Sequence, residues 1–299
     1  MSSRKKTGGR YVCDQSPFYK LRSKTRLAAI LEIAPSELKA HLKSTENDYS
    51  EFDITDKKKP NKKKRHIEEP KPKLRRIHKR IERLLNRIFP PNYLFCPAKR
   101  RSYVSNAKEH VSGTEITVLD IKKYYPSTRA SRVFQFFHEE MHCERDIAWV
   151  LMTLCSFKGH LPTGSPLSPI LSFLAHKRMW DRIAGIVEKA GCRLTVYVDD
   201  LTISGPKVPG SLVLAIKKEI VNTGLRYHKE KNYQGKGARK ITGVIIKDGE
   251  LRLPNAQHFK MYKLRKELAE ENNPENKKFI LEKIRGTQCQ AEQIKVANG

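Results

Sequence analysis

Hydrophobic and polar positions alternate in some stretches of the chain and repeat at helical spacing in others. Alternating stretches rich in β-branched and aromatic residues predict strands, and apolar residues three and four apart predict helices. The predicted order is strand 115–121, helices 131–157 and 170–190, hairpin 193–204, helix 211–223 and strand 241–246. Runs of strands and helices in this order predict an α+β fold with an antiparallel sheet.

Basic residues dominate the segments outside this series. Residues 1–26 form a basic arm that leads into a small helical region. A hairpin with a cationic tip is predicted across 49–67, and an amphipathic helix with a basic outer face across 74–89. A second hairpin through Asp248-Gly249 precedes a basic helical tail that begins near residue 255.

Two adjacent carboxylates mark the turn of the hairpin at 193–204. Asp199 and Asp200 follow Tyr197-Val198, and two consecutive aspartates suit a turn that faces solvent or a cation. Asp120 ends the apolar strand at 115–121 and supplies a third carboxylate. Three carboxylates from neighbouring strands are typical of a site that holds a pair of Mg²⁺ ions for phosphoryl transfer. This pattern predicts a nucleotide polymerase.

The charge balance indicates the partner. The 299 residues include 60 Lys and Arg against 32 Asp and Glu, a formal net charge of +28. The positive charge is spread along the chain, whereas a membrane-binding protein would concentrate it on one amphipathic helix. Nucleic acid is therefore the expected partner, and no membrane partner is expected.

Cysteine usage and the absence of long apolar runs indicate the compartment. The six cysteines form no CxxC pair and have no zinc-finger spacing, which is typical of reduced thiols. No apolar run follows the basic N-terminus, and no stretch has 18 uninterrupted apolar residues. We expect a cytoplasmic protein that is neither secreted nor membrane-spanning.

Five short motifs resemble those of a bacterial reverse transcriptase of the retron type. Tyr197-Val198-Asp199-Asp200 is similar to the catalytic box of that family, and Asp120–Ser127 to its first catalytic motif. Leu161–Pro169 is similar to the LPQGxxxSP stretch. Two elements resemble retron-specific signatures: Asn106–His110 fits NAxxH, and Ile241-Thr242-Gly243 fits VTG. The resemblance covers residues from about Tyr49 to Ile246.

The resemblance implies a role for each matching residue. Asp120, Asp199 and Asp200 would be catalytic and, with the backbone carbonyl of Ile121, would hold two Mg²⁺ ions. The incoming nucleotide would contact Lys58, Arg65, Tyr125, Thr163 and Lys231, with Tyr125 as the aromatic gate that blocks a ribose 2′-hydroxyl. RNA would contact Asn106, His110, Thr242 and Gly243.

Two residues depart from the family pattern. The glutamine of the LPQG motif is Thr163 here, and the usual small acidic or amide residue three places after Asp120 is Lys123. Threonine reaches less far than glutamine toward the sugar of an incoming nucleotide, so the nucleotide contact at position 163 is in question. The metal site does not depend on it.

A retron-type enzyme would have a right-hand architecture of fingers, palm and thumb. The implied divisions are an arm and N-terminal helical region at 1–44, fingers at 45–112, palm at 113–250 with part of the fingers near 142–165, and thumb at 251–299. Implied partners are dNTPs, a structured noncoding RNA, the branched RNA–DNA product (msDNA) made from it, and an effector protein of an anti-phage defence system.

Two other functions compete with this interpretation. His138-Glu139-Glu140-Met141-His142 fits the HExxH pattern of zinc peptidases, but no third zinc ligand follows at the usual spacing. A catalytically weak RNA-binding protein with a reverse-transcriptase fold is the other alternative, and Thr163 is its main support. The complete set of three aspartates favours the enzyme.

Overall fold

The computed structural model describes residues 9–55, 64–235 and 237–299. The chain folds as two compact units that interleave along the sequence. Unit 1 comprises residues 1–92, 121–183 and 218–227, and unit 2 comprises 93–120, 184–217 and 228–299. No helix in the described part of the chain is both long and apolar enough to cross a bilayer.

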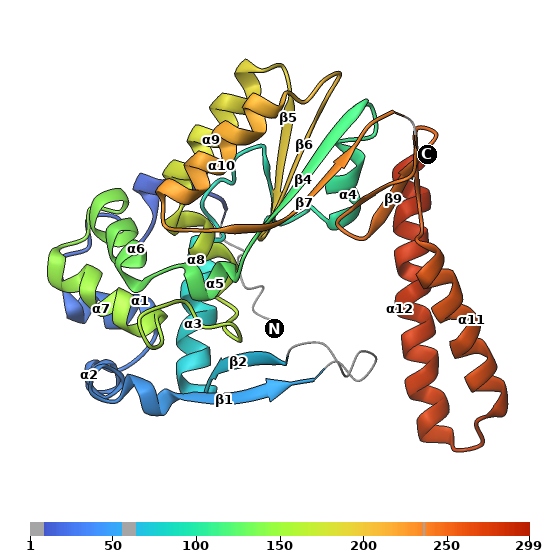
Figure 1. Cartoon of the computed structure of the whole chain (residues 1–299). Coiled ribbons are helices and arrows are strands. Elements are labelled where there is room, and N and C mark those ends of the chain that lie inside the picture. Colours follow the sequence, from blue (N-terminus) through green and yellow to red (C-terminus); the bar gives the residue numbers. More distant parts are fainter. Residues whose placement is uncertain (1–8, 56–63, 236) are drawn as a thin grey trace. The chain divides into compact units, whose positions relative to one another are not determined.

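Unit 1 is mainly helical and carries one two-stranded hairpin (Figure 1). The hairpin pairs β1 (Tyr49–Ile54) with antiparallel β2 (Arg65–Pro70), which confirms the predicted hairpin. Its helices are α1 (Lys24–Leu31), α2 (Pro35–Lys43), α3 (Pro72–Leu85), α5 (Tyr124–Ser127), α6 (Ala130–Gln135), α7 (Arg145–Cys155) and α8 (Ser168–Ala175). Helix α9 (Lys177–Lys189) begins in this unit, and the last residues of α10 (Gly210–Asn222) belong to it.

Helix α3 forms the centre of unit 1. Its Ile77, Ile81 and Leu85 are fully buried, as the amphipathic pattern predicts. His78 on the same face donates through Nε2 to the Leu154 carbonyl oxygen at 2.8 Å. Its Nδ1 lies 2.7 Å from Ser165 Oγ and accepts from that hydroxyl. Burial lowers the pKa of His78 to about 4, so the ring is neutral and joins α3 to α7 and to the turn before α8.

The single helix predicted over 131–157 is wrong. A π-helical turn at Phe136–Glu140 follows α6, His142 adopts a left-handed conformation with φ +51°, and α7 begins only at Arg145. The backbone of Lys20 donates to the Met141 carbonyl at 2.8 Å, so the N-terminal segment packs into the break. Hydrophobic periodicity continues through the break because both helices bury the same side. The helix predicted over 170–190 is likewise interrupted at His176.

Unit 2 contains a five-stranded sheet in the order β3-β5-β6-β4-β7. Its strands are β3 (Leu94–Cys96), β4 (Glu115–Ile121), β5 (Arg193–Tyr197), β6 (Asp200–Gly205) and β7 (Tyr227–Tyr233). Strand β6 pairs antiparallel with β4 and β5, and β3 pairs parallel with β5. The sheet is therefore rich in antiparallel pairs, and the α+β fold is confirmed.

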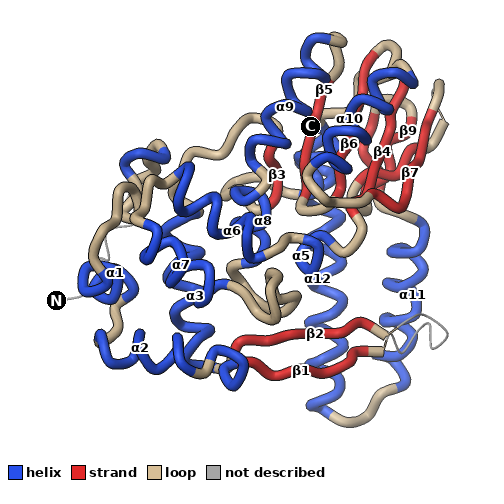
Figure 2. Tube along the Cα trace, turned by 60° about the vertical axis from the view of Figure 1, so that its left-hand side comes forward, coloured by secondary structure: helices blue, strands red, loops and turns tan. Residues whose placement is uncertain are grey.

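Shorter elements complete unit 2. Helix α4 (Tyr103–Lys108) packs with a three-stranded sheet of β8 (Arg239–Ile241), β9 (Val244–Lys247) and β10 (Glu250–Arg252) around buried Val104, Ile116 and Ile246. The predicted turn at Asp248-Gly249 joins β9 to β10. Helices α11 (Asn255–Glu270) and α12 (Pro274–Asn298) lie side by side in Figures 1 and 2 around Leu264, Ile280 and Ile284.

A buried histidine crosslinks the hairpin of β5 and β6. His110 lies 2.7 Å from Thr195 Oγ1 through Nε2 and 2.7 Å from Ser204 Oγ through Nδ1, and its side chain has no exposed surface. Burial lowers the pKa of His110 to about 3, so the ring stays neutral at physiological pH. The imidazole therefore joins the two strands that flank the turn of Val198 and Asp199.

We expect His110→Ala to lower the free energy of unfolding by about 2–4 kcal/mol, because it leaves a cavity and two buried hydroxyls without a partner. Urea titration followed by circular dichroism measures the change. His258→Ala, at an exposed position on α11, is the matched control and should change the free energy by less than about 0.5 kcal/mol. Equal unfolding midpoints for the two variants would contradict the structural role of His110.

Candidate active site

Strand register brings Asp120 and Asp200 together. The two residues lie directly opposite each other in the β4–β6 pair, and Tyr197 lies opposite Asp200 in the β5–β6 pair. Residues directly opposite each other in a sheet point to the same face, so both carboxylates lie on one face at the ends of their strands. Unit 2 alone therefore supplies the three aspartates that the sequence nominated.

Asp199 is held beside them by a tight turn. The hairpin connection consists of Val198 and Asp199, and Val198 has a φ of +59°. A β-branched residue rarely adopts this left-handed conformation, which costs of order 1–3 kcal/mol and is found most often at functional sites. The strained turn keeps Asp199 next to Asp200 at the tip of the hairpin.

Asp199 and Asp200 both have raised pKa values. Burial raises the pKa of Asp199, and the charge of Asp120 adds to this effect. Burial likewise raises the pKa of Asp200 to about 6, with further contributions from Asp199 and Asp120. Carboxylates that are partly removed from water and close to like charges need a cation to remain ionised together.

Strand β7 supplies two basic groups to this cluster. Lys229 Nζ donates to Asp120 Oδ2 at 3.1 Å, and His228 Nδ1 lies 3.3 Å from Asp120 Oδ1. The sequence nominated Lys231 instead; its charge lowers the pKa of Asp200, so it lies in the same field without a direct contact to Asp120. A single strand carries all three residues, and only the pairing register tells which of them reaches Asp120.

The donor set fits Mg²⁺. All three side chains offer hard carboxylate oxygens, which Mg²⁺ prefers, and the excess negative charge is what a divalent cation would compensate. The backbone of Ile121 directly follows Asp120 at the end of β4, and its predicted role as a carbonyl ligand stays a prediction.

The predicted nucleotide-binding residues outside the sheet belong to unit 1. Lys58 lies outside the described residues, and Arg65 is the exposed first residue of β2. Tyr125 on α5 is partly exposed, and its ring centroid lies 6.0 Å from that of Tyr124, which is buried and accepts a hydrogen bond from Trp180 Nε1. Of the two adjacent tyrosines, Tyr124 is the core residue and Tyr125 is the one that a ligand can contact.

Thr163 has a clear structural partner. Its hydroxyl donates to the His66 carbonyl at 3.1 Å and accepts from the Glu68 backbone N–H at 3.0 Å. The backbone of Gly164 adds a hydrogen bond to the Glu68 carbonyl at 2.9 Å, and a Cβ at position 164 would lie 2.8 Å from that oxygen. The turn that carries Thr163 in place of the family's glutamine is therefore hydrogen-bonded to β2. Nucleotide contact by Thr163 stays a prediction.

The two retron-like signatures meet in space although they are far apart in sequence. Asn106 Nδ2 donates to Thr242 Oγ1 at 3.3 Å, and Thr242 Oγ1 donates to the Tyr103 carbonyl at 3.0 Å. Asn106 and His110 are fully buried, whereas Thr242 and Gly243, which has φ +89°, are partly exposed. Any direct RNA contact in this region would therefore come from the 242–243 turn, and RNA contact by all four residues stays a prediction.

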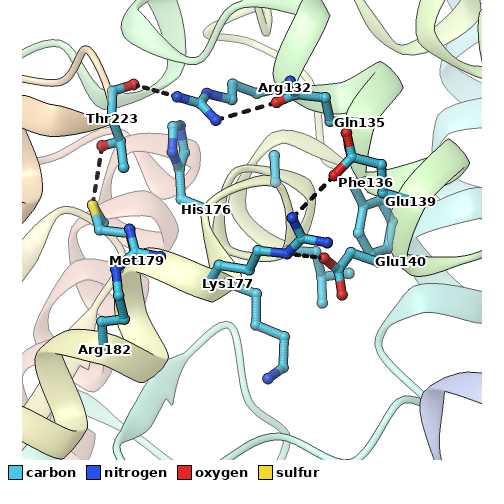
Figure 3. A pocket seen from close by; sticks show the side chains of 13 residues that line it. Arg132, Gln135, Phe136, Glu139, Glu140, His176, Lys177, Met179, Arg182 and Thr223 are labelled. Carbon is cyan, nitrogen blue, oxygen red and sulfur yellow. Dashed lines mark hydrogen bonds and ion pairs between the residues drawn. The ribbon is translucent and has the colours of Figure 1, made fainter.

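The HExxH pattern does not form a metal site. The break in the helix separates its ends: His138 Nδ1 contacts the Cys143 carbonyl oxygen at 3.0 Å, and the His142 ring packs against Tyr19. Glu139 pairs with Arg178 at 3.0 Å on the wall of a polar pocket (Figure 3). Within the described residues, one group of three or more His, Cys, Asp or Glu has its ligand atoms all within 4.8 Å of one another, and it lies elsewhere, at Glu51, His66 and Glu68.

We expect Asp200→Asn to stabilise the metal-free protein at pH 7 by about 1–2 kcal/mol, because it removes a charge that burial disfavours and that Asp199 and Asp120 repel. The raised pKa means that the charged form is disfavoured in the folded state; the penalty is full above pH 6 and disappears near the unfolded value of about 4. The gain should therefore shrink as the pH falls from 7 to 4.

Thermal unfolding in the presence of a chelator measures this effect. Asp248→Asn, an exposed residue of the β9–β10 turn, is the matched control and should leave the melting temperature nearly unchanged. Excess Mg²⁺ should stabilise the unmodified chain more than the Asp200 variant. A lower melting temperature for Asp200→Asn in chelator would refute the repulsion between these carboxylates.

Comparison with known proteins places the chain in a family. The family described as "Reverse transcriptase (RNA-dependent DNA polymerase)" matches residues 57–246, which include all three aspartates. Retron Ec86 reverse transcriptase of Escherichia coli is 30% identical over 200 residues, covering 64% of this chain and 61% of that protein. Retron Se72 reverse transcriptase of Salmonella heidelberg is 31% identical over 186 residues, covering 60% of this chain and 48% of that protein.

A third relative, retron Mx65 reverse transcriptase of Myxococcus xanthus, is 29% identical over 206 residues, covering 61% of this chain and 48% of that protein. The chain thus spans between about half and three fifths of the length of these relatives. The matched family segment holds the β4 and β6 aspartates, and each of these relatives is a retron enzyme. The chain belongs to the reverse transcriptase family.

Proposed function

We propose that this protein is an RNA-directed DNA polymerase. The observation that carries the proposal is that Asp120 and Asp200 lie opposite each other on one face of the unit 2 sheet, with Asp199 in the adjoining turn, inside the segment that the reverse transcriptase family matches. DNA synthesis requires in-line attack of a primer hydroxyl on the α-phosphate of a nucleotide, and paired carboxylate-bound ions are the usual means of assisting it.

Each aspartate has a distinct part in this proposal. Asp120 and Asp199 hold the ions, and Asp200 supports them through its position opposite Asp120. Bound Mg²⁺ ions supply Lewis-acid activation of the hydroxyl and neutralise the charge on the leaving pyrophosphate. Lys229 and His228 contact Asp120 in this structure, and Asp120 would give up these contacts to hold the ions.

We assign the parts of a right hand to the observed elements. The five-stranded sheet with its aspartates is the palm, the β1–β2 hairpin belongs to the fingers, and the α11–α12 pair is the thumb. As the family resemblance implies, Lys58 and Arg65 would hold the triphosphate, and Lys231 the pyrophosphate. The four-part division at residues 44, 112 and 250 stays a proposal.

The retron type of the relatives suggests the substrate. We propose that the template is a structured noncoding RNA, that dNTPs are consumed and that the product is a branched RNA–DNA molecule. The net charge of +28 supports a polyanionic partner. An effector protein, and a role in defence against phage, follow from the retron type as further proposals.

Asp199→Asn should abolish Mg²⁺-dependent DNA synthesis, with a loss of several orders of magnitude, because it removes a charged metal ligand. RNA binding should stay within about threefold, since one charge among the many basic residues contributes little. Primer extension on an RNA template and filter binding of the same RNA measure the two effects.

The matched control is Asp181→Asn, an exposed aspartate of α9 paired with Lys177, which should extend primers normally. Near-normal extension by the Asp199 variant would refute the assignment. No extension by the unmodified chain on any primed RNA, together with tight RNA binding, would favour the RNA-binding protein with an inactive fold.

Tyr125→Val should admit ribonucleotides, because the aromatic ring no longer blocks a ribose 2′-hydroxyl. Incorporation of dNTPs should persist. Single-nucleotide addition of dNTP and rNTP measures the discrimination, and Tyr125→Phe, which keeps the ring, should discriminate as the unmodified chain does. Equal discrimination by the Val and Phe variants would assign Tyr125 to a packing role.

A further inference from the structure

The β1–β2 hairpin concentrates acidic and imidazole groups on one face, in a chain that is otherwise strongly basic. Glu51 lies directly opposite Glu68 and Asp53 directly opposite His66, so the alternation of the strands directs all four side chains to the same side. Two glutamates directly opposite each other repel, which destabilises the hairpin unless neighbouring cations compensate. This face lies within unit 1 and is separate from the aspartates of the sheet.

Three of these side chains converge closely. The ligand atoms of Glu51, His66 and Glu68 all lie within 4.8 Å of one another. His66 Nε2 lies 3.0 Å from Glu51 Oε2. The Glu68 side chain is only 6% exposed, so its carboxylate is held in place rather than solvated.

Both histidines of this region are oriented as metal-site histidines are. His66 Nδ1 lies 3.0 Å from Asp53 Oδ1, which directs Nε2 toward Glu51. His160 Nδ1 lies 3.2 Å from the Lys158 carbonyl oxygen, and its Nε2 lies 2.9 Å from Glu68 Oε1. A ligating imidazole normally has its second nitrogen bound to a carboxylate, and a ligating carboxylate is itself hydrogen-bonded.

We propose that Glu51, His66 and Glu68 bind a divalent transition-metal ion of the Zn²⁺ class. Asp53 positions His66, and His160 positions Glu68. One imidazole and two carboxylates form a mixed nitrogen and oxygen donor set that favours Zn²⁺ over Mg²⁺, since Mg²⁺ selects oxygen ligands alone.

Zinc binding would exchange the proton on His66 Nε2 for the metal ion. In the metal-free chain His66 contacts carboxylates through both nitrogens, and Asp53 and Glu51 raise the pKa of its imidazole. Zn²⁺ takes the Nε2 position, and the proton of that nitrogen is released to solvent. Lys158, which donates to Glu51 Oε1 at 2.6 Å, competes with the ion and is half-exposed, so it can turn away.

The ion would have a structural role. It would join β1 to β2, and through Glu68, whose backbone and side chain contact Thr163, it would reinforce the attachment of the 160–164 turn to β2. The proposal depends on unit 1 geometry alone and not on polymerase activity.

Zinc titration of the full-length chain after chelator treatment tests the site. Isothermal calorimetry should show one Zn²⁺ per chain with micromolar or tighter affinity, unaffected by millimolar Mg²⁺. His66→Ala and Glu68→Gln should each weaken binding at least tenfold, and Asp53→Asn should weaken it by roughly ten- to a hundredfold through loss of orientation. His66 is half-exposed, so its variant should fold normally.

Two variants and one spectrum distinguish a zinc ion on the hairpin from zinc bound by cysteines and from an ion-pair network without metal. His138→Ala removes a histidine of the same unit whose Nδ1 contacts a backbone carbonyl, and it should leave the affinity unchanged. Lys158→Met should tighten zinc binding several-fold, because it removes the competing cation, whereas a purely structural ion-pair network would only lose stability. Substitution with Co²⁺ should give no thiolate charge-transfer band in the near ultraviolet, which excludes the six cysteines.

The proposal is overturned by the absence of saturable zinc binding, by equal losses in His66→Ala and His138→Ala, or by a thiolate band in the Co²⁺ spectrum. Weaker zinc binding by Lys158→Met would also overturn it and would identify the hairpin face as an ion-pair network only.

Discussion

Repulsion among three carboxylates is the constraint on which the rest of unit 2 depends. The sheet places Asp120 opposite Asp200 and adds Asp199 through a strained turn, all partly shielded from water. His110 joins β5 to β6 through Thr195 and Ser204, which share a sheet face with Asp200, and Lys229 and His228 contact Asp120 from β7. The neutral His110 and the basic side chains of β7 therefore hold the three aspartates in a position suited to divalent ions.

The sequence predicted the parts of this site that follow from alternation and turn chemistry. The hairpin around Asp199, the strand that ends at Asp120 and the α+β order all follow from local patterns, and the structure confirms them. The break at residues 141–144 could not be predicted, because hydrophobic periodicity persists through it while the backbone of Lys20 fills the gap from far away in sequence. The sequence nominated Lys231 and not Lys229. Both lie on the same exposed strand, and only the pairing register shows which of them contacts Asp120.

The burial of Asn106 and His110 also depends on long-range contacts. A short polar segment before a strand suggests a binding loop, yet Ser204 and Thr195, which satisfy His110, lie about ninety residues downstream. The acidic face of the β1–β2 hairpin could not be predicted for a different reason. Its Glu, Asp and His residues alternate with apolar or polar neighbours on two strands, and only the register of Glu51 with Glu68 shows that they share a side. In a chain with 60 basic residues, such local reversals of charge are visible only in three dimensions.

The way Thr163 and Gly164 bind β2 bears on how the protein opens locally. The Thr163 hydroxyl makes two hydrogen bonds to the backbone of β2. Gly164 lies so close to β2 that no side chain would fit at that position. The turn thus behaves as an additional short edge of the hairpin. Separating the turn from β2 breaks all three of these hydrogen bonds at once. We therefore expect the amides of Glu68 and Gly164 to exchange their hydrogens with solvent in one opening event, and a movement of the β1–β2 hairpin to carry the 163–164 segment with it.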